Sequence, residues 1–600
     1  MIFVCASIDA SAPAAGSATV ATMAAGRRTG GGAAAMHELG AAALASSGCA
    51  VYTAEAGVAQ LAVFCPHGAA APADDVLQRL AAGFASSGML DASALHGPFV
   101  ACGYDSQRTS WAVANDRFGI CQVYVAADGG SLRFATDLDA LVAGLPARPV
   151  LDDQAIYDYV FFHCIPAPRT IYRDIVKLGP AHCLSWSGGN PETGVYWQPQ
   201  FAADGAPVPS GNALLEALEA AVREAARPPC GAFLSGGLDS SSVAGMLKRA
   251  REDAATFTIG FDAEGYDESG FARIAAEHFG TRHHAYFVTP RDVAEALPLI
   301  AAHYGEPFGN SSVVPAYYCA KFAREHGVEV MLAGDGGDEL FAGNTRYTDQ
   351  NVFEAWFRVP GMLRALLKGG YRLLPFMGQL PLAGKGARYI AQAEMGLPDR
   401  LQSYNFLNRF APESVFSGEF LAGVDRSAPW ALWRARYAAC TAPSALQRML
   451  YLDWKFTLAD NDLVKVSHMC DLAGVEVAYP MLDERVVELA CRVPPSALLR
   501  DGMLRGFYKH ATRGFLPDAV IEKSKHGFGL PFGVWMQRDD GLRALAADAF
   551  DLLARRGIFD VAFLRDVQRL HGEGAAGYYG ELVWILSVLA LWLDAHDRRA

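Results

Sequence analysis

Short apolar stretches separated by glycine, serine and aspartate characterise the first quarter of the chain. Before about residue 149 they recur at residues 99–102, 110–113 and 132–135. Runs of this length, bounded by turn-forming residues, are typical of β-strands rather than of helices. The pattern therefore predicts a small sheet domain, followed by a connecting region rich in proline and aromatic residues at 151–200 and a linker at 199–211.

A different pattern begins after the linker, where short apolar runs alternate with longer amphipathic ones. It predicts strands at 231–234, 255–261, 284–288 and 328–333, and helices at 240–251, 271–279 and 314–326. Strands that alternate with helices indicate a parallel sheet covered on both faces. Beyond residue 343 the spacing is mostly helical, so we expect a fold of the α/β class with a helical C-terminal part.

Composition limits the classes of partner and compartment. The 600 residues carry a net charge of −13 with no run of lysine and arginine, which predicts no nucleic-acid partner and no anionic membrane surface. Twelve cysteines are scattered without a C-x-x-C pair, as expected of a cytoplasmic protein. No basic region of a secretory signal precedes the apolar N-terminus. The apolar run at 582–593 is too short to cross a bilayer, so we expect a buried helix there.

The segment Leu-Ser-Gly-Gly-Leu-Asp-Ser-Ser at residues 234–241 is the sharpest candidate for chemistry. It lies between a predicted strand and a predicted helix. Its glycines let backbone N–H groups turn inward, its hydroxyls add donors, and the helix N-terminus adds positive potential. Together these features predict an anion cradle in which Asp239 helps to bind a magnesium ion that bridges phosphate oxygens. The alternative is an ordinary glycine turn with a helix cap.

A second glycine-rich loop, Ala-Gly-Asp-Gly-Gly-Asp-Glu at residues 333–339, also follows a predicted strand. Ligands of parallel sheets gather at the carboxyl ends of the strands, so we expect the two loops to face one site. Three acidic side chains in one turn are costly unless cations compensate them. A role with magnesium and phosphate is therefore favoured over a turn without chemistry.

The two loops together resemble the synthetase domain of class B asparagine synthetases. The resemblance continues at residues 474–483 and 523–528, and in the first half at 115–119 and 166–172. It implies an N-terminal, glutaminase-type sandwich of the N-terminal-nucleophile hydrolase kind at residues 1–200. It also implies an ATP-pyrophosphatase domain with a PP-loop at residues 211–600. The cofactors implied are ATP and Mg²⁺.

The resemblance also implies a role for each matching position. Adenine would lie against Leu234 and Ile259, with Ala333 and Gly334 also contacting the nucleotide. Pyrophosphate would be held by a further set: Ser235, Gly236, Gly237, Ser240 and Ser241. Magnesium would be bound by Asp239 and Asp338. Lys525 would stabilise developing charge, and Asp335 is the candidate general base for the attacking amine.

The first domain lacks the residues that release ammonia from glutamine in that family. Residue 2 is Ile2 where the family has a cysteine nucleophile, and Cys5 lies within an apolar run, so we expect it to be a core residue. The turns that would bind glutamine are absent as well. The attacking amine is therefore expected to arrive as part of the substrate.

Two groups of the wider family resemble this arrangement: β-lactam synthetases and lasso-peptide macrolactam synthetases. We favour the second, in which the N-terminal amine of a precursor core peptide is joined to an Asp or Glu side chain. The expected partners are that precursor peptide and a leader-peptide protease. Aromatic residues of the C-terminal part are either core or walls of a peptide cavity. The alternatives are an asparagine synthetase that uses free ammonia and a catalytically silent binding subunit.

Overall fold

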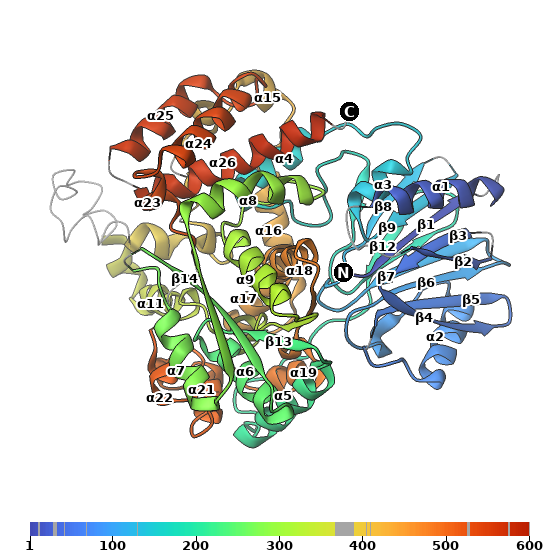
Figure 1. Cartoon of the computed structure of the whole chain (residues 1–600), viewed down its shortest axis with the longest axis horizontal. Helices are drawn as coiled ribbons and strands as arrows, with labels where there is room; N and C mark the ends of the chain where they lie inside the picture. The colour runs from blue at the N-terminus through green and yellow to red at the C-terminus, as the bar shows by residue number, and fades with distance from the viewer. Residues whose placement is uncertain are drawn as a thin grey trace.

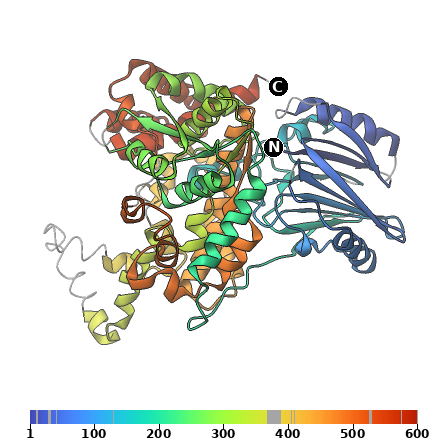
Figure 2. The ribbon, with the colours of Figure 1, turned by 60° about the horizontal axis from the view of Figure 1, so that its bottom comes forward.

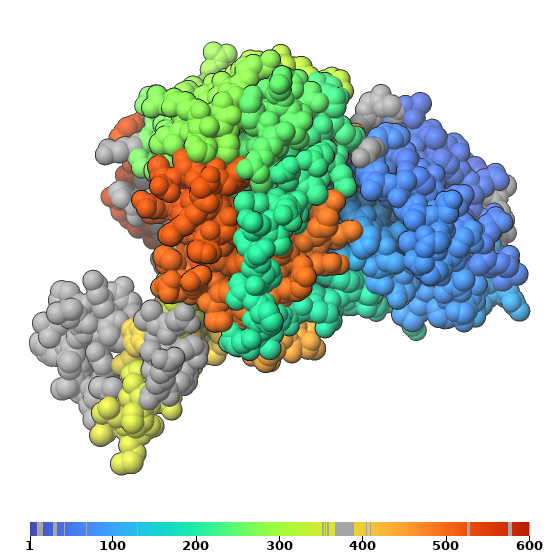
Figure 3. All heavy atoms as spheres, turned by 90° about the horizontal axis from the view of Figure 1, so that it is seen from below, coloured from blue at the N-terminus to red at the C-terminus, as the bar shows by residue number. Residues whose placement is uncertain are grey.

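The computed structural model has an N-terminal lobe and a larger lobe that lie side by side (Figure 1, Figure 3). The structure describes residues 1–9, 13–27, 33–40, 42–67, 69–128, 130–263, 265–366, 389–403, 405–408, 410–524, 529–573 and 576–598. The N-terminal lobe is blue and the larger lobe runs from green to red in both figures.

Two antiparallel sheets of six strands build the N-terminal lobe. Their strand orders are β10-β8-β9-β1-β3-β2 and β12-β11-β7-β6-β5-β4. The strands are β1 (Phe3–Asp9), β2 (Ala35–Leu39), β3 (Ala42–Ser47), β4 (Cys49–Ala56), β5 (Ala59–Pro66), β6 (Val100–Asp105), β7 (Ser110–Asn115), β8 (Tyr124–Asp128), β9 (Ser131–Ala135), β10 (Ile175–Lys177), β11 (His182–Trp186) and β12 (Glu192–Val195). A short 3₁₀ helix, η1 (Ala92–Ala94), precedes β6.

The two sheets pack face to face and are covered by helices on their outer faces. Val4, Phe64, Val113 and Phe134 belong to the apolar layer between the sheets. α1 (Pro13–Gly26) and α3 (Leu138–Ala143) pack on the first sheet, and α2 (Asp74–Ser87) packs on the second. This layered sandwich confirms the predicted glutaminase-type fold, which Figure 1 shows with α1 and α2 on opposite sides.

The connecting region predicted at 151–200 is more regular than its proline content indicates. It holds α4 (Asp153–Phe162) and the strands β10, β11 and β12, which complete both sheets. α4 is buried beside α26 (Ala576–Asp597) of the larger lobe, where the Tyr159 hydroxyl donates a 2.8 Å hydrogen bond to the carbonyl of Ile585 (Figure 1). Short strands with interrupting prolines carry little periodicity, which explains why the pattern did not reveal them. Residues 196–210 then form an extended crossing to the second lobe (Figure 2).

A parallel sheet of five strands forms the centre of the larger lobe, in the order β15-β14-β13-β16-β17. The strands are β13 (Cys230–Phe233), β14 (Ala255–Phe261), β15 (Arg282–Val288), β16 (Val330–Leu332) and β17 (Glu476–Ala478). The helices between them are α5 (Gly211–Ala225), α6 (Leu238–Ala250), α7 (Ser269–Phe279), α8 (Pro290–His303) and α9 (Val313–Glu325). The four strands and three helices predicted here are confirmed, with ends displaced by a few residues.

The strand order reverses at β13. The chain runs outward from β13 to β14 and β15, then returns to place β16 on the other side of β13. Helix N-termini and loops diverge at such a switch point and leave a crevice beyond the carboxyl ends of the strands. The two glycine-rich loops follow β13 and β16, so the topology places them on either side of this crevice.

Helices make up most of the remaining chain, as predicted. They are α10 (Gly337–Phe341), α11 (Arg346–Arg358), α14 (Pro412–Val415), α15 (Gly418–Ala422), α16 (Ala428–Ala439), α17 (Ala445–Asp453), α18 (Leu463–Leu472), α19 (Glu484–Arg492), α20 (Pro495–Leu498), α21 (Gly506–Ala511), α22 (Asp518–Glu522), α23 (Phe532–Met536), α24 (Asp540–Ala554), α25 (Val561–Gly572) and α26 (Ala576–Asp597). Short 3₁₀ helices are η3 (Asp399–Gln402), η4 (Phe406–Asn408), η6 (Pro480–Leu482) and η7 (Arg500–Gly502), and η5 (Trp454–Asp462) is a π-helix.

The apolar run at 582–593 lies within α26 and is buried, as predicted. Trp584 and Trp592 are among the largest fully buried side chains of the protein. α26 packs on α8, α23, α24 and α25. Among the described residues, no helix is both long and apolar enough to cross a membrane.

Candidate functional site

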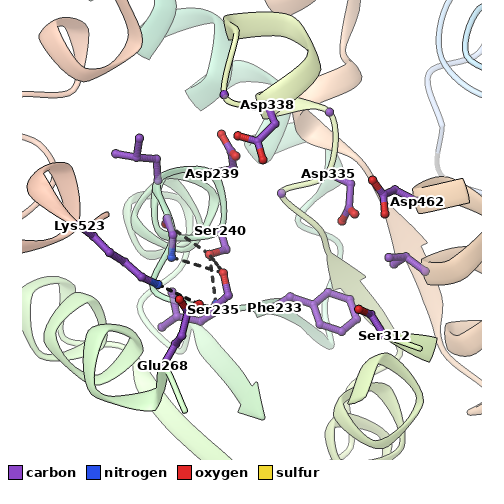
Figure 4. A pocket seen from close by; sticks show the side chains of 18 of the residues that line it. Phe233, Ser235, Asp239, Ser240, Glu268, Ser312, Asp335, Asp338, Asp462 and Lys523 are labelled. Carbon is purple, nitrogen blue, oxygen red and sulfur yellow. Dashed lines mark hydrogen bonds and ion pairs between the residues drawn. The ribbon is translucent and has the colours of Figure 1, made fainter. Parts of the chain in front are cut away.

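A cavity of about 790 Å³ opens at the carboxyl ends of β13, β14 and β16 (Figure 4). Both glycine-rich loops contribute to its walls, as do the π-helix η5, the start of α18 and the segment before α21. The residues that line it include Leu234, Ser235, Gly237, Asp239, Ser240, Ile259, Glu268, Asn310, Gly334, Asp335, Gly337, Asp338, Glu339, Thr457, Asp462, Lys465, Arg505, Lys523 and Ser524.

The first loop is a tight turn from β13 into α6. Gly236 has a φ of +70°, and a Cβ at this position would collide with α7, so only glycine fits. The hydroxyl of Ser240 accepts a 3.1 Å hydrogen bond from the Ser235 N–H and lies 2.9 Å from the Ser235 hydroxyl. The Gly237 N–H donates a 3.3 Å hydrogen bond to the Ser235 hydroxyl. Backbone and hydroxyl donors therefore converge on one point of the cavity wall.

Helix α6 begins at this point without a side chain that caps its N-terminus. The first N–H groups of a helix have no partner within the helix and carry its positive potential. They therefore suit an anion such as phosphate. The alternative interpretation, in which Asp239 or a serine acts as a conventional cap, does not describe this helix, because Gly237 occupies the N-cap position.

The second loop packs directly against the first, and its glycines make this contact close. A Cβ on Gly334 would lie 2.7 Å from the backbone nitrogen of Ser240. A Cβ on Gly337 would overlap the Asp239 carboxylate, and a Cβ on Gly343 would overlap that of Asp338. The glycines of this loop are therefore required by the approach of two acidic side chains as well as by the turn.

Arg505 lies between the two carboxylates that were predicted to bind magnesium. Its Nη1 donates a 2.8 Å hydrogen bond to Oδ2 of Asp239, and its Nη2 binds Oδ1 of the same carboxylate. Nη1 also lies 3.5 Å from Oδ1 of Asp338. Burial opposes the charge of the guanidinium, but Asp239 and Asp338 together raise the pKa of Arg505. Both aspartates thus face one point of the cavity, next to the cradle of the first loop.

The donor set around this point fits a magnesium ion. Mg²⁺ in nucleotide sites is held by one or two carboxylates, with phosphate oxygens and water completing an octahedron. Asp239 and Asp338 supply the carboxylates, and the described residues add no third acidic, histidine or cysteine ligand to form a closed site. The arrangement therefore suits an ion that arrives with a nucleotide better than a permanent structural metal.

Asp335 occupies a different wall of the cavity from Asp239. Burial raises the pKa of its carboxyl to about 6, although Lys465 opposes the shift. Asp462 and Asp239 raise this pKa further. Lys465, in turn, donates a 2.7 Å hydrogen bond to Oδ1 of Asp462. Asp335 is thus poised to gain or lose a proton near neutral pH, as a general base requires.

Two of the three acidic side chains of the second loop lie near a cation, and the third has a raised pKa. Asp338 lies 3.5 Å from Arg505, and the charge of Lys465 lowers the pKa of Asp335. Glu339 is 7% exposed, and burial, reinforced by Asp338, raises the pKa of its carboxyl well above the ordinary value. The expectation that an acidic turn needs cations therefore applies to two of its three members.

The predicted nucleotide residues divide into two groups. Leu234, Ser235, Gly237, Asp239, Ser240, Ile259 and Gly334 line the cavity, as do the predicted Asp335 and Asp338. Gly236, Ser241 and Ala333 do not line it, and the Ser241 and Ala333 side chains are fully buried. The Ser241 hydroxyl is buried at 0% exposure inside α6, so its predicted contact with pyrophosphate stays a prediction. The sequence could not show this burial, because adjacent serines look equivalent in a motif.

Lys525 lies outside the described residues, so its assigned role stays a prediction. The two residues before it, Lys523 and Ser524, line the cavity. Lys523 forms a 3.0 Å ion pair with Glu268, which Figure 4 shows beside Ser235. Lys523 is therefore a second cation near the phosphate cradle.

Sequence reasoning did not identify Arg505, Asp462 or Lys465 as site residues. Arg505 has a left-handed backbone conformation with φ of +59°. This conformation is uncommon for residues other than glycine, so the sequence around Arg505 did not indicate it. Lys465 did carry a signal, because it stands within the apolar run 463–466 at the start of α18. A lysine in such a setting is usually paired, since burial of an isolated charge is costly.

The aromatic residues of the C-terminal part whose side chains the structure describes do not wall the cavity. Trp433, Tyr451 and Trp454 are buried in the core, as are Trp535 and Trp584. None of them lines the cavity. The core interpretation of these rings is therefore the right one for the described side chains.

The thiol predicted to be a core residue is buried in the first sheet. Cys5 lies in β1 at 0% exposure, and burial raises its pKa to about 12. A nucleophilic cysteine needs a low pKa and access to solvent. Cys5 has neither property.

Comparison with known proteins identifies the family. The asparagine synthase family model matches residues 213–594, and a glutamine amidotransferase domain model matches residues 77–197. A putative glutamine-hydrolysing asparagine synthetase of Mycobacterium tuberculosis is 27% identical over 551 residues, covering 88% of this chain and 80% of that protein. Asparagine synthetase 1 of Bacillus subtilis is 24% identical over 434 residues, which are 71% of this chain and 66% of that protein.

A third relative is a putative asparagine synthetase of Methanocaldococcus jannaschii. It is 30% identical over 398 residues, which are 64% of this chain and 74% of that protein. The family match covers more than half of the chain and includes both glycine-rich loops, Arg505 and Lys465. The chain therefore belongs to the asparagine synthase family.

Proposed function

We propose that this protein adenylates a carboxylate with ATP and joins it to an amine that its own substrate provides, without hydrolysing glutamine. Membership of the family makes the chain an ATP-dependent carbon–nitrogen ligase that forms AMP. The source of the amine is the part that this proposal adds. It separates the chain from relatives whose names state that they hydrolyse glutamine.

The inaccessibility of the thiols carries the proposal. All twelve cysteines lie among the described residues, and every one is buried. The amidotransferase match begins at residue 77 and leaves out β1, where Cys5 is packed into the core. Release of ammonia from glutamine by a cysteine needs an accessible thiolate. The first domain offers none.

In the first step the substrate carboxylate displaces pyrophosphate from ATP. The donors of Ser235, Gly237 and the α6 N-terminus would hold the leaving pyrophosphate, and Arg505 and Lys523 would balance its charge. Asp239 and Asp338 would hold magnesium, which when bound neutralises phosphate charge and orients the oxygens. Leu234 and Ile259 supply apolar walls for adenine.

In the second step an amine displaces AMP from the activated carboxylate. Asp335 would accept a proton from the amine, since its raised pKa of about 6 combines an ionised form at neutral pH with useful basicity. Lys525 would stabilise the tetrahedral intermediate, as the family resemblance implies.

For the substrate we favour a precursor core peptide that is closed into a macrolactam through an Asp or Glu side chain. An amine in the same molecule has a high effective concentration and replaces delivered ammonia. The cavity has a volume of about 790 Å³ and is bordered by several loops, and a space of this size suits a bulky substrate. A leader-peptide protease would then act before this enzyme. In the alternative β-lactam synthetase-like reaction, a small molecule likewise supplies both the carboxylate and the amine.

A second candidate is an asparagine synthetase that uses free ammonia. It is favoured by the names of the relatives, which are asparagine synthetases. It needs the same adenylation site and no thiol in the first domain. The two candidates therefore differ in the substrate and not in the first chemical step.

The test incubates the full chain with ATP, magnesium and one of two substrate sets. One set is a core peptide with a free N-terminus and an internal Asp or Glu, and the other is aspartate with ammonia. Ring closure predicts AMP release with loss of one water from the peptide, and an N-acetylated peptide is the matched control. AMP release with aspartate and ammonia but not with peptide would select the second candidate. Amide formation that requires glutamine would contradict both.

A further inference from the structure

A cation of the chain itself lies between the two carboxylates that are predicted to bind magnesium. Nη1 of Arg505 donates a 2.8 Å hydrogen bond to Oδ2 of Asp239, and Nη2 binds Oδ1 of the same side chain. Nη1 also lies 3.5 Å from Oδ1 of Asp338. A guanidinium matches a carboxylate in this two-point way, so one side chain engages both oxygens of Asp239.

The surroundings of Arg505 hold its guanidinium at this place. The side chain is 6% exposed, and the centre of the Tyr508 ring lies 4.8 Å from its central carbon. The backbone has a φ of +59°, which a residue with a side chain adopts at a cost and keeps where the fold fixes it. Its N–H donates a 3.3 Å hydrogen bond to the carbonyl of Ala342, directly after α10. The position of the guanidinium is therefore set by packing and not by the carboxylates alone.

A free magnesium ion would compete with this guanidinium for Asp239. An ion bound by a carboxylate lies about 2.1 Å from the oxygen. On Oδ2 of Asp239 it would lie within about 5 Å of Nη1 of Arg505, because Nη1 is 2.8 Å from that oxygen. The two side chains are 6% and 17% exposed, so solvent screens them weakly and two cations this close repel each other strongly. Without further negative charge, the carboxylate holds only one of them.

Phosphate groups at the first loop would remove this conflict. Ser235, Gly237 and the N-terminus of α6 form the predicted phosphate cradle, and Arg505 lines the same cavity. Phosphate charges there would offset the second cation, and phosphate oxygens would complete the ligands of the ion. They would also offer acceptors to the guanidinium, whose Nε is buried without a hydrogen-bond partner among the described residues. The ion and the guanidinium can then share the site.

We propose that Arg505 is a resident cation of the magnesium site, which excludes divalent ions until a nucleotide brings its own negative charge. In the nucleotide-free protein the guanidinium neutralises Asp239. When a nucleotide binds, the guanidinium turns toward the phosphates and leaves this carboxylate to the ion, and no covalent bond changes. The inference rests on the proposed function, because the ion concerned is the one that serves adenylation. The ion should therefore bind only together with ATP.

The experiment measures binding of Mn²⁺, which prefers the same oxygen ligands as Mg²⁺ and is followed by the electron paramagnetic resonance signal of the free ion. The full-length wild type without nucleotide should leave almost all of the ion in solution. An ATP analogue that cannot be cleaved between its α- and β-phosphates should give protein-bound ion, beyond what the analogue holds alone. Arg505→Gln keeps a hydrogen-bond donor and loses the charge, so its nucleotide-free affinity should rise about 10-fold or more.

Unfolding provides a second readout, which does not depend on turnover. A ligand that binds only the folded state raises the free energy of unfolding by mass action. Mn²⁺ without nucleotide should therefore raise the urea midpoint of Arg505→Gln and leave that of the wild type unchanged. Arg505→Lys retains a positive charge and should lie closer to the wild type than to Arg505→Gln in both measurements.

The matched control is Lys523→Gln, because Lys523 is another cation of the same cavity wall. It forms its 3.0 Å ion pair with Glu268. Its loss should leave the nucleotide-free affinity for Mn²⁺ unchanged. An equal rise in both variants would overturn the inference, since any positive charge in the cavity would then have the same effect.

The wild type alone can also overturn the inference. Tight binding of Mn²⁺ without nucleotide would show that the guanidinium excludes no ion, and an unchanged affinity in Arg505→Gln would show the same. Failure of the proposed function looks different, because the wild type would then show no pyrophosphate exchange with either substrate set. The Mn²⁺ measurements do not use that exchange, so they decide the role of Arg505 in either case.

Discussion

The guanidinium of Arg505 lies against the carboxylate of Asp239 through two N–H···O bonds, although 266 positions separate the two residues in the chain. The pair is buried, with 6% and 17% of the side chains exposed. It brings the segment before α21 to the start of α6 and holds a cation beside the phosphate cradle. The positive charge of Arg505 is therefore already in place beside the cradle before a nucleotide binds.

Removal of that cation should destabilise the protein. In Arg505→Met, Asp239 and Asp338 would stay in the cavity wall without their positive partner, and loss of one member of a buried pair costs about 3–5 kcal/mol. Urea unfolding of the ligand-free protein measures the change. Arg505→Lys keeps the charge and should recover much of the stability. Equal stability of Arg505→Met and wild type would mean that the pair is not formed in solution.

Replacement of either predicted magnesium ligand should strongly impair adenylation, and Asp239→Asn should also lower stability because it removes a charge partner of Arg505. Asp239→Asn and Asp338→Asn keep the shape of the side chain and remove its charge, so pyrophosphate exchange should fall by about 10²-fold or more. Titration with magnesium should show a raised requirement for the ion. Glu277→Asn, on the exposed side of α7, is a control that should behave as wild type. Normal exchange in Asp239→Asn would remove this residue from the site.

The contact between the two loops can be tested at one glycine. Gly337→Ala would place a methyl group against the Asp239 carboxylate and 2.7 Å from Nη2 of Arg505. Displacement of the carboxylate by about 1 Å should lower the exchange rate by about 10²-fold. Gly270→Ala, where a Cβ meets nothing within 4 Å, is the matched control. Two variants with equal activity would show that the loops do not pack this closely.

The amine-joining step should depend on pH through Asp335. Because the pKa of this carboxyl is raised to about 6, the group is protonated below that pH and cannot accept a proton from the amine. Amide formation should therefore rise as the pH increases through about 6, and pyrophosphate exchange should not show this step. Lys465 lowers this pKa, so Lys465→Met should move the midpoint upward. An unchanged midpoint in Asp335→Asn would assign it to another group.

The buried thiol of the first domain should be dispensable. Cys5→Ala removes a core sulfur at 0% exposure, so a modest loss of stability is expected with turnover unchanged. Glutamine should not replace the substrate amine in either protein. The comparison uses AMP release with and without glutamine. Glutamine-dependent activity that disappears in Cys5→Ala would contradict the proposal that the protein does not hydrolyse glutamine.

Local patterns were sufficient for the elements that carry the cradle. The strands before both loops and the helix after Asp239 were predicted, because apolar runs and glycine turns are properties of short segments. The same patterns did not reveal β10 to β12 in the region 151–200, since strands of three to five residues between prolines have little periodicity. The family motifs also could not tell the cavity-lining Ser240 from the buried Ser241.

The sequence by itself determined two phosphate-type loops, the parallel sheet that bears them and a first domain without an accessible nucleophile. Only the tertiary structure decided which charges meet. Arg505 lies against Asp239 and Asp338, although a chain path that runs across several helices separates it from both. Local propensity is a property of neighbouring residues, whereas a charge pair depends on which distant segments the packing brings together. The cation that faces the two carboxylates is therefore visible only in the folded molecule.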